Sequence, residues 1–108
     1  MEEIKFVGLK ELSEDDQSKV QKLCTEYYGK IRRMLKNQVS ITVQFKQYDK
    51  EGNRTKYSIN IKASAPTRIF TSNKEADWDV SKALHKAFED LETQIEHTFH
   101  TDYQKSRK

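Results

Sequence analysis

The segment from residue 39 to residue 63 alternates apolar and polar side chains, and this alternation constrains the fold more tightly than any other feature. A period of two is typical of strands that bury one face. Residues 49–53 separate two alternating runs, and Gly52 among them can supply the positive φ of a turn. The sequence therefore predicts a hairpin of two half-buried strands. Its polar face would carry Thr42, Gln44, Lys46, Lys56, Ser58, Asn60 and Lys62.

Two helical patterns flank the hairpin. Apolar residues recur every three or four positions within residues 13–36, which predicts a helix there. Ser13 precedes three acidic residues, a combination typical of a helix N-terminus. A second pattern begins near residue 77, where either Asp77 or Asp79 can cap the helix. Its apolar stripe consists of Val80, Leu84, Ala87, Phe88, Leu91 and Ile95.

The rest of the chain adds two short strands. Residues 3–8 alternate and end at a glycine, and residues 67–71 can form a further strand after Pro66 interrupts the hairpin. The expected order is β-α-β-β-β-α, an α+β fold with two helices packed on one face of a mostly antiparallel four-stranded sheet. The chain of 108 residues is expected to form a single domain over residues 1–102. Residues 103–108 are expected to be a basic, frayed tail.

Charge is unevenly distributed along the chain. Residues 30–74 contain eleven Lys and Arg against only Asp49 and Glu51, so this segment carries +9 although the whole chain carries +3. Such segregation is typical of a polyanion-binding surface. Two simpler interpretations stay open. The surface can be an ordinary solvated one, and cations near residue 36 also compensate the negative end of the first helix.

The sequence contains no specific catalytic pattern. It has no Gly-rich phosphate loop, and its one cysteine, Cys24, lies on the apolar stripe of the first helix, as expected of a small buried hydrophobe. His97 and His100 are three residues apart, but no further ligands complete a metal site. Trp78 is expected to pack at the entrance of the second helix, although it or Tyr48 can also stack on a base. We therefore expect no enzymatic activity, cofactor, metal or small-molecule substrate.

The sequence also predicts where the protein resides. No stretch approaches 18 consecutive apolar residues, and the acidic N-terminus lacks the apolar segment of a signal peptide. We expect a cytoplasmic protein that does not contact membranes.

The second helix carries the most specific pattern. Its sequence contains Asp79, Ala83, Leu84, Ala87, Leu91, Gln94 and Ile95 at the spacing Asp-x-x-x-Ala-Leu-x-x-Ala-x-x-x-Leu-x-x-Gln-Ile. This resembles the signature helix of the ribosome hibernation-promoting factors, also called ribosome-associated translation inhibitors, and the order of elements agrees over about residues 3–100. The resemblance implies a fold similar to a double-stranded-RNA-binding domain with an extra first strand. It also implies binding to the small ribosomal subunit near the decoding centre, where the protein blocks the tRNA and mRNA path of idle ribosomes.

The chain departs from the family pattern in three respects. The second helix has Thr93, Glu96 and His97 where family members usually have basic residues, and Ser81 where they have an aromatic. The sequence ends after the second helix, without the long form's C-terminal dimerisation domain, so we expect that it does not pair ribosomes by that route. We expect a monomer off the ribosome. A plain double-stranded-RNA-binding domain is a weaker interpretation, because residues 74–79 are mostly acidic where such domains place lysines.

The predicted partner is therefore small-subunit rRNA, bound through a basic surface without catalysis. One alternative is a protein-interaction or regulatory module that keeps the fold without binding the ribosome, and another is a generic structured-RNA-binding domain. The candidate RNA-binding residues come from the end of the first helix, from the sheet and its loops, and from the start of the second helix. They are Lys30, Arg32, Arg33 and Lys36, then Lys46, Arg54, Lys56, Lys62 and Arg68, and finally Lys82 and Lys86.

Overall fold

The computed structural model describes residues 3–36, 38–52, 54–66 and 68–106. A short 3₁₀ turn at Leu9–Glu11 follows the first strand. The main elements are β1 (Glu3–Val7), α1 (Glu14–Leu35), β2 (Ser40–Glu51), β3 (Arg54–Ser64), β4 (Ile69–Asp77) and α2 (Val80–Ser106). This confirms the predicted order β-α-β-β-β-α. No helix in these ranges is long and apolar enough to cross a membrane.

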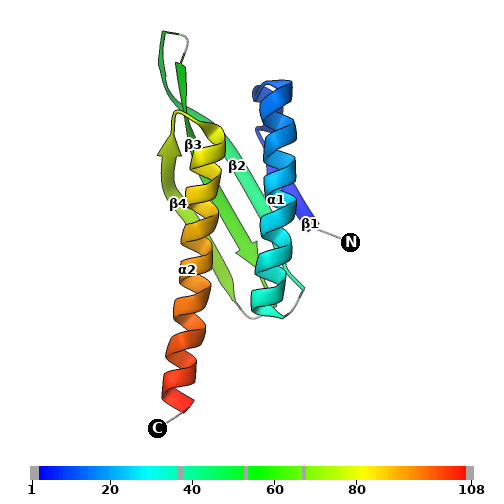
Figure 1. Ribbon diagram of the computed structural model, residues 1–108, viewed down its shortest axis with the longest axis vertical. Coiled ribbons are helices and arrows are strands. Elements are labelled where there is room, and N and C mark those ends of the chain that lie inside the picture. Colours follow the sequence, from blue (N-terminus) through cyan, green and yellow to red (C-terminus); the bar gives the residue numbers. More distant parts are fainter. Residues whose placement is uncertain (1–2, 37, 53, 67, 107–108) are drawn as a thin grey trace.

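The four strands form one sheet in the order β1-β2-β3-β4. β1 pairs with β2 in parallel, whereas β2, β3 and β4 pair antiparallel, so the sheet is mixed. Both helices cover the same face of this sheet, as Figure 1 shows, and the other face is open. The predicted α+β architecture is therefore confirmed.

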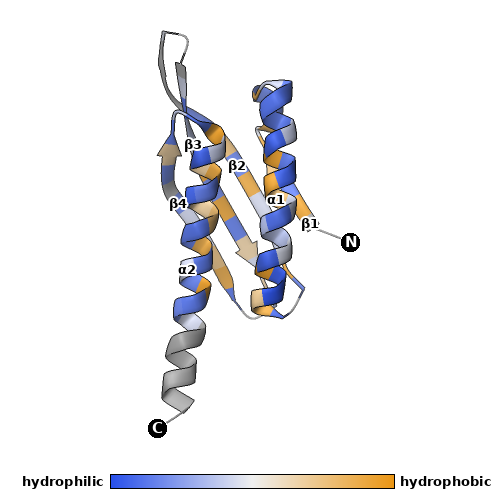
Figure 2. Ribbon diagram, viewed as in Figure 1, coloured by the Kyte–Doolittle hydropathy of each residue, from blue (hydrophilic) through white to orange (hydrophobic). Residues whose placement is uncertain are grey.

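The strand register separates an apolar face from a polar one. Val43 pairs with Ile61 and Phe45 with Ile59 on the face under the helices, where all four are buried. The opposite face carries the pairs Thr42–Lys62, Gln44–Asn60 and Lys46–Ser58, as predicted. The core lies between the sheet and the buried stripes of the two helices, seen as orange segments in Figure 2.

Side chains fix the starts of both helices. The Ser13 hydroxyl accepts a hydrogen bond from the Asp16 amide at 3.2 Å, which confirms the predicted N-cap of α1. Of the two candidate caps of α2, Asp79 accepts from the amides of Ser81 and Lys82 at 2.9 and 3.3 Å. Asp77 precedes this cap in β4.

The β2–β3 hairpin is tighter than expected. β2 continues to Glu51, which pairs with Arg54, so the turn does not begin at residue 49. Gly52 has a φ of 59° and supplies the positive φ that the sequence predicted.

The fourth strand is the main correction. The sequence predicted a strand over residues 67–71 and a helix from about 77, whereas β4 runs from Ile69 to Asp77 and α2 begins at Val80. Thr67 lies outside the described residues. The second half of β4 is polar, and a register shift opposite Ile59 and Ile61 interrupts any alternation. Pairing with β3, rather than a local apolar pattern, places this segment in the sheet.

The helix α2 continues beyond residue 102, and the predicted domain boundary stays a prediction. The helix runs to Ser106, past the boundary predicted between a domain over residues 1–102 and a tail over 103–108. Arg107 and Lys108 lie outside the described part of the chain.

Candidate nucleic-acid interface

The eleven predicted RNA-binding cations do not share one face. The end of α1 presents Arg32, Arg33 and Lys36, all exposed, near one end of the sheet, beyond which α2 continues (Figure 1). The open sheet face presents a second group, and the remaining cations lie beside α2. The described fold thus divides the basic segment of the sequence into separate surfaces.

An open hollow of about 500 Å³ lies at the end of α1, and we call it the α1 hollow. It is lined by Gly29, Arg32, Arg33, Lys36 and Gln38. The sequence analysis found its three cations but not Gly29 or Gln38. A glycine three or four residues before two arginines on a helix was the available signal, because such positions share one helical face.

Lys30 lies near these cations but faces a different neighbour. Its Nζ lies 5.1 Å from the centre of the Tyr27 ring, a cation–π contact. Burial raises the pKa of Glu92 on α2, and the nearby charge of Lys30 lowers it in part. Lys30 therefore belongs to the contact between the two helices.

The open sheet face is basic and rich in hydroxyls and amides. Lys46 and Lys62 are exposed and Lys56 is half-buried. Thr42, Gln44, Asn60, Ile61, Lys62, Thr71, Ser72 and Asn73 line a shallow hollow of about 300 Å³ at this part of the sheet. Arg54 pairs with Glu51 in the backbone ladder, but its side chain lies outside the described structure.

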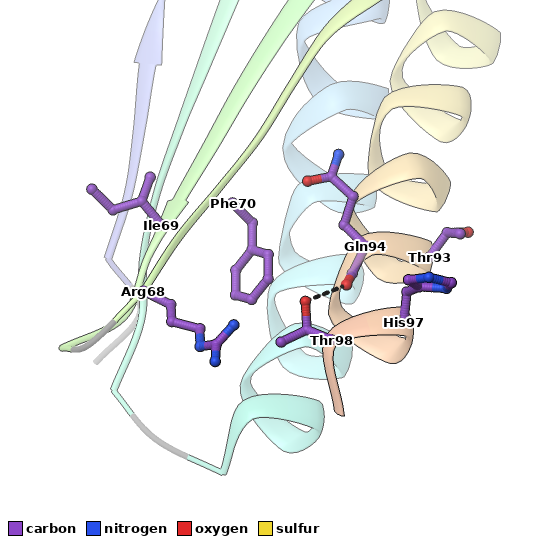
Figure 3. A pocket seen from close by; sticks show the side chains of 7 residues that line it. All are labelled: Arg68, Ile69, Phe70, Thr93, Gln94, His97 and Thr98. Atoms are coloured by element: carbon purple, nitrogen blue, oxygen red, sulfur yellow. Dashed lines mark hydrogen bonds between the residues drawn. The ribbon is translucent and has the colours of Figure 1, made fainter. Parts of the chain in front are cut away.

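Arg68 was expected to act with these lysines, and the structure places it on the other side of the sheet. Figure 3 shows the side chains of Arg68, which directly precedes β4, and of Phe70 within β4 pointing toward α2, whereas Ile69 points away. These three residues line an open pocket of about 520 Å³ together with Thr93, Gln94, His97 and Thr98. The alternation of side chains along a strand is the reason, since positions 68 and 70 share the face under the helices.

Lys82 and Lys86 lie in the first turns of α2. Lys82 is exposed, whereas the Nζ of Lys86 forms an ion pair with Oδ2 of Asp77 at 2.8 Å. This ion pair, together with a hydrogen bond from the Asp79 amide, lowers the pKa of Asp77 to about 2. The positive charge of Lys86 is thus largely compensated by the carboxylate of Asp77 at the end of β4.

The side chains considered for chemistry occupy ordinary structural positions. Cys24 is fully buried, as predicted, and burial raises its pKa to about 12, so it is not a reactive thiolate. His85 is exposed, and its Nδ1 lies 2.6 Å from the Tyr27 hydroxyl. His97 is exposed, and the side chain of His100 lies outside the described residues. Within the described ranges, no group of three or more His, Cys, Asp and Glu side chains is placed to hold a metal.

The two aromatic candidates for base stacking differ in what the structure describes. Trp78 is half-buried next to the start of α2, where it lines a hollow together with Tyr57 and Val80. The side chain of Tyr48 is outside the described part of the chain.

Comparison with known proteins gives one family. The model of the family described as sigma 54 modulation protein / S30EA ribosomal protein matches residues 8–100. This range begins directly after β1 and includes α1, the other three strands and α2 up to residue 100. No curated protein and no solved structure shows a significant match.

Proposed function

Since the chain belongs to the sigma 54 modulation / S30EA ribosomal protein family, a family of ribosome-associated modulation factors, we propose that it is a hibernation factor that inhibits translation by binding small-subunit rRNA. The proposed site is near the decoding centre, where the bound protein would occupy the tRNA and mRNA path. Steric occupation needs no reaction, so the proposed activity requires no catalytic residue and no cofactor. The protein would act in the cytoplasm as a monomer off the ribosome.

The main support for this proposal is the presence of two basic surfaces, formed by residues that follow each other in the sequence. The α1 hollow brings together Arg32, Arg33 and Lys36, and the described charged side chains of the open sheet face are all lysines. Arg binds phosphate oxygens through two parallel hydrogen bonds, whereas Lys acts as a point charge. Together they suit the irregular phosphate backbone of folded rRNA.

The later part of α2 is a poor candidate for phosphate contact. Glu89 and Glu96 are exposed on it, and Glu92 is half-buried between them. These carboxylates repel phosphate, and the ion pair of Lys86 with Asp77 reduces the positive charge nearby. We therefore assign the leading role in RNA binding to α1 and the open sheet face.

The same acidic helix favours a second candidate function. A module that keeps the fold but binds a protein would not need a basic α2. In this chain the later part of α2 exposes carboxylates instead. A generic structured-RNA-binding domain is a third candidate, which shares the basic surfaces but not the ribosomal target.

Sedimentation through a sucrose cushion with purified ribosomal subunits separates these candidates. The proposed function predicts that the protein pellets with small subunits and not with large subunits at low salt. Pelleting with neither subunit contradicts it and favours the protein-interaction module. Equal pelleting with both subunits and with unrelated folded RNA favours the generic RNA-binding domain.

A further inference from the structure

Gly29 occupies a position at which the fold does not require glycine. It lies within α1, and its φ is not positive, unlike those of Gly8 and Gly52. A Cβ placed on Gly29 would meet no atom within 4 Å apart from its own helix neighbours. Alanine is markedly more favourable than glycine inside a helix. The chain therefore keeps a destabilising residue where packing would accept a larger one.

Gly29 lies among cationic side chains on the outer face of α1. Gly29, Arg32, Arg33 and Lys36 are spaced i, i+3, i+4 and i+7, so they share one face of α1. That face is opposite the buried stripe of α1, and its three cations are exposed. The absence of a side chain at Gly29 is what opens the α1 hollow between them.

One residue of the same hollow, at the end of α1, has an unfavourable backbone conformation. Lys36 has a φ of 52°, in the left-handed region where helices usually end with glycine. Its amide donates to the Arg32 carbonyl at 2.8 Å, which fixes this turn. Position 29 thus holds glycine although alanine would stabilise the helix more. Position 36 holds lysine although glycine would adopt the left-handed conformation more readily. Glycine at position 29 keeps the α1 hollow open, and lysine at position 36 adds a positive charge to its lining.

The electrostatics of the α1 hollow suit an anion. Its lining contains three cationic side chains and no acidic one. The C-terminal end of a helix carries a partial charge of only about −0.5, which three full positive charges exceed. Arginine side chains on two sides of an open floor can grip an oxyanion that approaches the helix backbone closely.

We propose that the α1 hollow seats one phosphate group of an RNA strand, with Gly29 as the point of closest approach. This inference rests on the proposed function and adds a specific contact to it. The RNA backbone would lie across the outer face of α1, and the guanidinium groups of Arg32 and Arg33 would hold the phosphate from either side of Gly29. Lys36 would supply the third positive charge at the end of the helix.

The test replaces Gly29 with leucine, because a leucine side chain would fill the α1 hollow without removing a charge. Leucine is a better helix former than glycine, so Gly29→Leu is expected to melt at the same or a higher temperature. Ser18→Leu is the matched control, since Ser18 is exposed on the same face about three turns nearer the N-terminus. Gly29→Ala is a milder variant that adds only a methyl group.

Binding is measured by fluorescence anisotropy with two ligands, purified small subunits and a short labelled RNA hairpin, at several salt concentrations. Gly29→Leu is expected to weaken binding by roughly tenfold, the scale of a charge-assisted hydrogen-bond contact. The slope of log K against log salt should become less steep by about 0.7 to 0.9, as for the loss of one phosphate. Ser18→Leu should bind like the wild type, and Gly29→Ala should lie between the wild type and Gly29→Leu.

The outcomes for the two proposals are distinguishable. If Gly29→Leu binds both ligands as tightly as the wild type does, the phosphate seat is wrong, while ribosome binding by the wild type still supports the function. If the wild type binds the hairpin but not the subunits, and Gly29→Leu weakens hairpin binding, the seat is supported and the proposed function is wrong. If Ser18→Leu weakens binding as much as Gly29→Leu, the α1 hollow has no special role and the inference fails.

Discussion

At the scale of single residues, Tyr27 makes three side-chain contacts, two with α2 and one with Lys30 of its own helix. Its ring stacks on Phe88 with centroids 4.5 Å apart and an interplanar angle of 4°. Its hydroxyl meets Nδ1 of His85 at 2.6 Å, and Lys30 lies over the ring. The spacing of apolar residues within 13–36, a stripe that includes Tyr27, predicted that this side chain points inward. It could not predict the partner of its hydroxyl, because that partner is 58 positions away and depends on how the helices pack.

Removal of the Tyr27 hydroxyl tests this contact. We expect Tyr27→Phe to lower the free energy of unfolding by about 1 kcal/mol, because the stacking stays and one hydrogen bond is lost. Tyr27→Ala also loses the ring and should cost about 3–5 kcal/mol. Urea denaturation measures both values.

His85→Ala provides the double-mutant cycle for the same contact. After His85→Ala, the further change Tyr27→Phe should cost much less than in the wild type, since the hydrogen bond is already absent. Fully additive costs would show that the 2.6 Å contact does not stabilise the protein.

The Asp77–Lys86 ion pair gives a prediction for acid stability. The pKa of Asp77 in the folded protein is about 2, below its ordinary value of 3.8, mainly because Lys86 donates to its carboxylate. A carboxyl group whose pKa is lower in the folded state stabilises the fold above the unfolded pKa and loses this effect as the pH falls. The contribution of the pair is therefore complete above about pH 4 and disappears between about pH 4 and pH 2.

Lys86→Met should raise the pKa of Asp77 toward 3.8, as measured by the carboxyl carbon shift in an NMR titration. The variant should also lose less stability than the wild type between pH 4 and pH 2. Lys82→Met removes a charge from the same helix and should leave the Asp77 titration nearly unchanged. An Asp77 pKa that does not respond to Lys86→Met would contradict the ion pair.

At the scale of elements, local signals predicted the helices and the hairpin well. Ser13 and the apolar stripe of α1 identify a helix without knowledge of its surroundings, and the β2–β3 alternation identifies both strands. β4 was predicted only in part, because its second half has no apolar period. Ser72 is buried within it and its hydroxyl has no hydrogen-bond partner among the described atoms. Such a segment is a strand only because β3 offers it backbone partners.

The candidate site shows a similar limit. The sequence identified the basic segment and the end of α1, since charge can be counted along a chain. It grouped Arg68 with Lys62, although the two side chains leave the sheet on opposite faces. Assigning Arg68 to a face requires the register of the first half of β4 against β3. Because the adjacent Ile69 and Phe70 are both apolar, the alternation does not show which of them faces the core.

The end of α1 and the start of α2 are predicted to differ in their importance for RNA binding. Arg32→Ala with Arg33→Ala should weaken binding to small subunits by about 1–3 kcal/mol in total, on the scale of hydrogen bonds to charged groups. Both side chains are exposed, so the melting temperature should barely change. Lys82→Ala with Lys86→Ala is the comparison, and it should cost less because Lys86 is paired with Asp77.

Fluorescence anisotropy with labelled protein measures both double variants against the same subunits. Circular dichroism melting curves check that each variant remains folded. If the α2 pair proves more damaging to binding than the α1 pair, our placement of the RNA-binding face is wrong.

At the scale of the whole molecule, the fold converts a sequence of alternating charge blocks into separate surfaces. The segment 30–74 carries +9 and supplies the end of α1 and all of β2 and β3. Residues 75–108 contain five basic and eight acidic residues, and the described part of this segment includes the end of β4 and all of α2. Because α2 covers the sheet on the face opposite the open one, its carboxylates are kept away from the lysines of the open face (Figure 1).

This separation predicts a steep dependence of subunit binding on salt. The cations of the α1 hollow and the lysines of the open face can neutralise several phosphates, and each neutralised phosphate releases counterions. With about 0.7 to 0.9 units per phosphate, the slope of log K against log salt should be roughly −3 to −5. Titration of labelled protein with small subunits across a series of KCl concentrations measures it. The Arg32→Ala and Arg33→Ala double variant loses the one phosphate that both arginines hold, so its slope should be less steep by about 0.7 to 0.9 units. A wild-type slope near zero would mean that phosphates contribute little, and binding would then depend on a ribosomal protein instead of rRNA.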